Sequence, residues 1–144
     1  MNKKLLLLLF LFVSNLVSSQ SNKVFIENKG QWDSRIEYNQ ILSDGNLFLE
    51  KDGFTYSLFE KFYIRLLHDD KNATVPSVIK SHAVKTKFLN ANKDVVIQKL
   101  DTSSFYYNYF IGDNKSKWQS EVRSTSKVAY RELYPSIDHC TTIC

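Results

Sequence analysis

Residues 46–59 read NLFLEKDGFTYSLF, and this stretch decides the fold. On both sides of Lys51-Asp52-Gly53, apolar residues recur at the period of two that is typical of a β-strand. An Asp-Gly pair supplies the positive φ angle that a tight turn needs. The stretch therefore predicts a β-hairpin with strands over residues 46–50 and 54–59.

Similar patterns on either side of this hairpin predict more strands. Ile36 and Tyr38 would share one face of a strand over residues 35–41. The other predicted strands cover residues 62–67, 82–88, 94–100, 105–110 and 126–130. About eight short strands separated by turns indicate an all-β, antiparallel domain that is sandwich-like or barrel-like.

The strand over residues 82–88 has two distinct faces. Val84, Thr86 and Phe88 would lie on one face, whereas Lys85 and Lys87 would point to water. The polar residues 68–81 before it predict a surface loop, in which Pro76 disfavours regular structure.

The first nineteen residues predict export. Lys3 and Lys4 precede the unbroken apolar run of residues 5–13, and small residues follow, as in a secretory signal peptide. The alternative is an uncleaved anchor, but the run is shorter than the roughly 20 apolar residues of a membrane span. We therefore expect a signal peptide over residues 1–19, a single β-rich domain over residues 20–144, and a secreted or cell-surface location without a membrane span.

Charge and cysteine content exclude several classes. The net charge is +4, and Lys3 and Lys4 leave with the signal peptide, so the sequence lacks the basic signature of a nucleic-acid-binding domain. The two cysteines, Cys140 and Cys144, could close only a small terminal loop. Hydrophobic packing must therefore hold the fold together.

None of the three histidines is a strong candidate for a catalytic or metal-binding role. His68 lies beside two aspartates, which fits either a pH-sensitive or metal-binding loop or a solvated turn, and the turn is favoured. His82 is expected to begin a strand and to bond with backbone. His139 and Cys140 resemble half of a zinc site, but structural zinc needs four ligands. We expect no catalytic residue, no metal and no cofactor.

The aromatic residues near position 110 are the one suggestive surface. Tyr106, Tyr107, Tyr109 and Trp118 could form a face that stacks against sugar rings. The favoured interpretation places these rings, together with Phe105 and Phe110, in the core, because aromatic side chains bury a large apolar area. Two Asn-x-Ser/Thr patterns, at Asn72 and Asn114, match N-glycosylation sites, which would matter only in a eukaryotic secretory pathway.

Three stretches resemble a known family: FIENKGQW at residues 25–32, NYFIGDNKSKW at 108–118, and VAYRELYPSID at 128–138. They resemble the N-terminal domain of large secreted, gliding-motility-associated surface proteins. Those proteins often carry β-propeller or immunoglobulin-like repeats and a type IX secretion signal. The chain departs from that family at Ser136, where Gly is usual. It departs again after Asp138, where the family continues with a Tyr-Tyr-Gly strand, and this implies that the chain is the leading part of a longer domain.

The resemblance implies a non-enzymatic extracellular structural or interaction module, with a role in adhesion or gliding. Its partners would be surface glycans or other cell-envelope proteins. Three alternatives remain at this stage: a carbohydrate-binding module with an aromatic face, a hydrolase, and a truncated fragment without function. The hydrolase is disfavoured because no nucleophile and base stand out in the sequence.

Overall fold

The computed structural model of the chain describes residues 23–60 and 78–142, and between them Phe62, Arg65, Leu66, Asp69, Asp70, Asn72 and Thr74. Ten strands form in this described part. They are β1 (Phe25–Glu27), β2 (Ile36–Leu42), β3 (Gly45–Glu50), β4 (Gly53–Phe59), β5 (Ser81–Lys87), β6 (Val96–Lys99), β7 (Tyr106–Tyr109), β8 (Gln119–Thr125), β9 (Lys127–Tyr134) and β10 (Ile137–Thr142). A short 3₁₀ helix, η1 (Lys115–Lys117), precedes β8.

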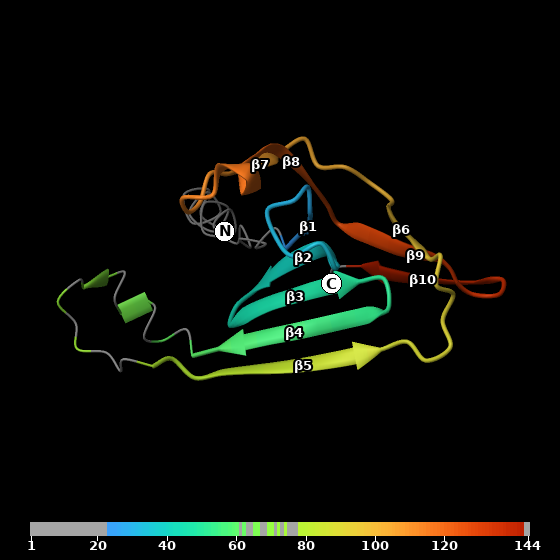
Figure 1. The fold of residues 1–144 in the computed structure, drawn as a ribbon, viewed down its shortest axis with the longest axis horizontal. Helices are drawn as coiled ribbons and strands as arrows, with labels where there is room; N and C mark the ends of the chain where they lie inside the picture. The colour runs from blue at the N-terminus through green and yellow to red at the C-terminus, as the bar shows by residue number, and fades with distance from the viewer. Residues whose placement is uncertain are drawn as a thin grey trace, which may run out of the picture.

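The strands form two antiparallel sheets (Figure 1). The larger sheet has seven strands in the order β5-β4-β3-β2-β1-β8-β7, and the smaller has three in the order β10-β9-β6. Both sheets are open, so the fold is sandwich-like rather than a closed barrel. The prediction of an all-β antiparallel domain is confirmed.

Two glycines allow strands β3, β4 and β5 to pack side by side. A Cβ atom on Gly53 would lie 1.9 Å from the backbone oxygen of Thr86 in β5, and one on Gly45 would lie 2.0 Å from that of Ser57 in β4. The positive φ expected of the Asp-Gly turn is found at Gly53, at +156°. The glycine is therefore needed for the close approach of the next strand as well as for the turn.

The core lies between the two sheets. Eight buried apolar residues form it: Phe25, Tyr38, Leu47, Leu49, Val95, Val128, Tyr130 and Leu133. Phe88 packs against this cluster and contacts Tyr130 edge-to-face, with ring centroids 5.3 Å apart. Edge-to-face contact is a favoured aromatic geometry and adds to the stabilisation from burial.

The chain crosses between the sheets at Ser126, the one residue that separates β8 from β9 (Figure 1). Asp101 holds this crossing, because its carboxylate accepts hydrogen bonds from the Ser126 backbone N–H at 2.8 Å and from the Ser126 and Thr125 hydroxyls. The sequence alone did not distinguish Asp101 from an ordinary surface charge.

One predicted strand needs correction. The strand predicted over residues 62–67 is wrong, because the described residues Phe62, Arg65 and Leu66 are helical. Leu66 accepts a backbone hydrogen bond from Asp70 at 2.8 Å, the i to i+4 contact of a helical turn. A short apolar run fits either helix or strand, and periodicity alone does not separate the two.

The signal peptide, His68, Pro76 and Cys144 lie outside the described residues.

Candidate functional site

The aromatic run lies at an edge of the larger sheet, on and beside strand β7. Phe105 is 70% exposed, Tyr106 54% and Phe110 58%. The favoured expectation that the aromatic rings belong to the core is therefore wrong for these three residues. Residues 105–111 contain no charged side chain, so this strand edge combines unpaired backbone with exposed rings.

The structure divides the four predicted ligand residues among three groups of rings. Tyr106 lies against Arg123 of β8, whose guanidinium is 5.8 Å from the ring centroid. Tyr107 contacts Tyr109, with ring centroids 6.5 Å apart. Tyr109 in turn contacts Trp32 edge-to-face at 5.3 Å, and burial raises the pKa of its hydroxyl.

Trp118 belongs to the third group, beyond the end of β7. Its ring contacts Phe110 at 5.8 Å between centroids, and its indole N–H donates a hydrogen bond to the Gly112 carbonyl at 3.1 Å. The ammonium group of Lys115 lies 5.7 Å from the Trp118 ring. The predicted residues are therefore neighbours along one edge of the sheet rather than one flat platform.

A pocket of about 620 Å³ lies beside the start of β7 and combines aromatic and polar side chains. We call it the Phe105 pocket, and its lining includes Lys23, Asp101, Ser103, Phe105, Tyr106 and Ser124. Hydrogen bonds from Ser126 and then from Thr125 lower the pKa of Asp101, so its carboxylate is ionised at neutral pH. Of these residues, the sequence singled out only Tyr106 as a ligand candidate. A polar run directly before an aromatic run, DTSSFYY at residues 101–107, is the signal that could have revealed the others.

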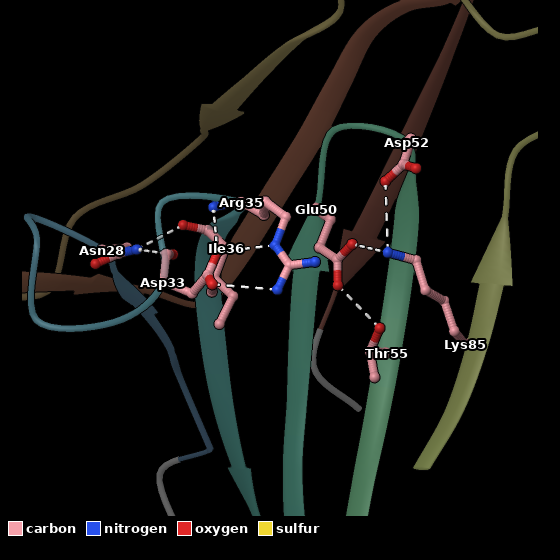
Figure 2. Close-up of polar contacts among 8 residues, drawn as sticks. All are labelled: Asn28, Asp33, Arg35, Ile36, Glu50, Asp52, Thr55 and Lys85. Atoms are coloured by element: carbon pink, nitrogen blue, oxygen red, sulfur yellow. Dashed lines mark hydrogen bonds and ion pairs between the residues drawn. The ribbon is translucent and has the colours of Figure 1, made fainter.

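The first family-like stretch has a structural role centred on Asn28. Its side-chain amide donates hydrogen bonds to the carbonyls of Asp33 and Ile36, at 2.9 and 2.7 Å (Figure 2). Its Oδ1 atom accepts from the backbone N–H groups of Gly30 and Trp32, at 3.0 and 3.2 Å. All four bonding positions of the amide are used, so Asn28 holds the loop between β1 and β2.

In the other two family-like stretches, Asn108 and Asp138 also fix irregular backbone by accepting a backbone hydrogen bond. The Asn108 amide oxygen accepts the backbone N–H of Glu121 at 3.1 Å, and Asp138 accepts that of Glu132 at 2.7 Å. Both glutamates have positive φ angles, and the strand pairing shifts register near each of them. These side chains therefore stabilise two β-bulges.

Arg131 completes the contact at Asp138, with 2.7 Å between its Nη1 and the carboxylate oxygen. The Glu132 backbone bond, followed by Arg131, lowers the pKa of Asp138. In the turn just before Asp138, Ser136 has a φ of +62°. This left-handed conformation explains why glycine suits that position better.

Glu50 is the most buried carboxylate in the described part of the chain, at 9% exposure. It accepts hydrogen bonds from the Thr55 hydroxyl at 2.9 Å and from the ammonium group of Lys85, which reaches over from β5 (Figure 2). Lys85 is exposed, as expected, but its ammonium group pairs with Glu50, which the sequence pattern did not predict. Lys87 is more exposed and lies 3.5 Å from Asp52.

The remaining positions named in the sequence analysis lie in strands or next to the 3₁₀ helix. His82 lies in β5 opposite Leu58. His139 lies near the rings of Phe88 and Tyr130, at 6.1 and 6.0 Å between centroids. Asn114 caps η1, because its side chain accepts the backbone N–H of Ser116 at 3.1 Å. No group of three or more His, Cys, Asp or Glu side chains that could hold a metal ion occurs among the described residues.

The comparisons with known proteins assign a family but no activity. Residues 25–142 match the family described as Domain of unknown function (DUF7948), and the chain belongs to this family. No curated protein and no solved structure matches the chain. Over the residues that the structure describes, no helix is both long and apolar enough to span a membrane.

Proposed function

We propose that this chain is a non-enzymatic interaction module of an exported cell-surface protein, with a role in adhesion or gliding. The proposal rests on the uncharged aromatic edge of the larger sheet, residues 105–111. Exposed apolar surface of this kind is a common feature of contact sites, since it is costly to leave in water. The signal-peptide pattern of residues 1–19 and the family resemblance support export and a surface location.

Three of the described carboxylates give indirect support to the non-enzymatic part of the proposal. Asp101 and Asp138 bind backbone N–H groups, and Glu50 is paired with Lys85. Each of these acids therefore has a structural task, which accounts for its position without a catalytic role. The exposed edge at β7 offers an apolar surface of the kind used in binding.

Two experiments test the two parts of the proposal. Export predicts that an epitope-tagged chain in its native host is cleaved by protease added to intact cells, whereas a chain retained in the cytoplasm would be protected.

For binding, we expect the purified chain to adhere to immobilised cell envelopes and the double variant Phe105→Ser, Phe110→Ser to lose most of that adhesion. The matched control is Leu89→Ser, since Leu89 is 77% exposed and lies outside residues 105–111. Equal adhesion by the double variant and the parent chain would contradict the proposal.

A further inference from the structure

The Phe105 pocket has the composition of a ligand site rather than of a general contact surface. Phe105 and Tyr106 supply apolar ring area, and Asp101, Ser103 and Ser124 supply polar groups beside it. Its volume of about 620 Å³ lies within the range of roughly 300–1,000 Å³ that is usual for small-ligand pockets.

Hydrogen bonds hold the polar wall of the pocket in place. The Ser103 backbone N–H donates to the Ser124 carbonyl at 2.9 Å, and the Phe105 backbone N–H donates to the Ser103 hydroxyl at 3.1 Å. Asp101 is fixed by its bonds to the β8–β9 crossing. A site held in this way binds without first ordering its own groups, which lowers the cost of binding.

Ser124 adds a hydroxyl group to the polar wall of the pocket. Ser124 is 2% exposed and lies in β8, so a hydrogen bond that a ligand forms with it is shielded from water. Hydroxyl groups, which donate and accept, are suited to Ser124 and to the acceptor-rich Asp101 alike.

The charge of the pocket narrows the class of ligand. Its lining carries one ammonium group, from Lys23, and one carboxylate, from Asp101. These two charges of the lining balance, and the guanidinium of Arg123 lies outside the lining, against the ring of Tyr106. Exposed rings stack well against the C–H face of a pyranose, whose hydroxyls then reach the polar wall.

From these observations we propose that the Phe105 pocket binds one or two units of an uncharged glycan. The inference rests on the proposed interaction function and names the chemical class of its partner. Phe105 and Tyr106 would stack on the sugar, while Ser124 and Asp101 would bond with its hydroxyl groups.

The test is a titration of the purified chain with neutral glucose-, galactose-, mannose- and N-acetylglucosamine-based oligosaccharides, with polygalacturonate as the acidic comparison. We expect saturable binding to at least one neutral series, followed by isothermal calorimetry. Phe105→Ala should weaken that binding about tenfold, and Ser124→Ala by a smaller factor. Leu89→Ala shortens an exposed apolar side chain outside both the pocket and residues 105–111, and it should leave the affinity unchanged.

Other results of the titration would overturn the glycan inference. Binding of the acidic polymer alone, or of no neutral series, overturns the inference, as does an equal loss of affinity in the Phe105 and Leu89 variants. If no neutral glycan binds but the chain still adheres to cell envelopes through residues 105–111, the glycan inference fails and the proposed function stands. If adhesion is also absent, both fail.

Discussion

The hydroxyl of Tyr130 donates a hydrogen bond to the carbonyl of Gly53, 3.3 Å away, and so links the smaller sheet to the larger one. Tyr130 is 1% exposed, so neither group can exchange this bond for one with water. We expect Tyr130→Phe to lower the free energy of unfolding by about 1 kcal/mol. Urea unfolding measures the change, and Tyr106→Phe, at an exposed hydroxyl, should alter stability by less than about 0.5 kcal/mol.

Replacing Gly53 should be more damaging than replacing a glycine in open space. A Cβ at Gly53 overlaps the Thr86 oxygen, so Gly53→Ala must displace β5 and should cost about 3 kcal/mol. Gly112 has a φ of +72° with nothing within 4 Å, so Gly112→Ala carries only backbone strain, about 1 kcal/mol. Equal losses in thermal unfolding would show that β5 does not constrain Gly53.

Ser136→Gly should stabilise the domain. Ser136 has a φ of +62°, a conformation that glycine adopts without the steric cost borne by other residues. We expect the free energy of unfolding to rise by about 1 kcal/mol, as measured with urea. Ser57→Gly in β4 is the control and should destabilise instead, since glycine weakens a strand interior. A loss of stability in both variants would argue against the turn geometry.

Asn28→Asp tests the loop between β1 and β2. The substitution keeps the shape of the side chain but places a carboxylate oxygen against the carbonyls of Asp33 and Ile36, where the amide donated. The loss of two hydrogen bonds and the repulsion that replaces them should cost about 2 kcal/mol or more at neutral pH. Chemical denaturation measures this loss. Stability within error of the parent would contradict the two hydrogen bonds that the Asn28 amide donates.

Stability should fall in alkaline solution. Burial, and then Glu27 and Glu37, raise the pKa of Tyr38 to about 12, whereas an unfolded tyrosine ionises near pH 10. Between these values the unfolded chain loses a proton that the folded chain keeps, so stability is complete below about pH 10 and declines up to about pH 12. Unfolding midpoints across this window should show the decline. Tyr38→Phe should make it shallower, and an unchanged slope would contradict the shift.

The hairpin was predictable because its information is local. Residues 46–59 contain both the strand pattern and the turn, and β3 and β4 form where expected. Strands β1, β8 and β10 were missed because their local patterns are weak. β1 has only three residues, β8 and β10 are largely polar, and β8 also pairs with β1, which is distant in the sequence.

The candidate site was only partly visible in the sequence. Tyr106 and Tyr107 were selected from composition, which says nothing about which ring faces water. Ser124 looks like any strand serine, and Asp101 like any surface acid, until the fold places both beside Phe105. A pocket of this kind is formed by residues that are distant in the sequence, so a local residue pattern does not reveal it.

The single-residue crossing at Ser126 has a mechanical consequence. β8 belongs to one sheet and β9 to the other, and Asp101 ties the join to the segment after β6. A force that pulls the layers apart is therefore carried directly by the covalent chain rather than by packing alone. The two layers should therefore resist sliding and yield together under load.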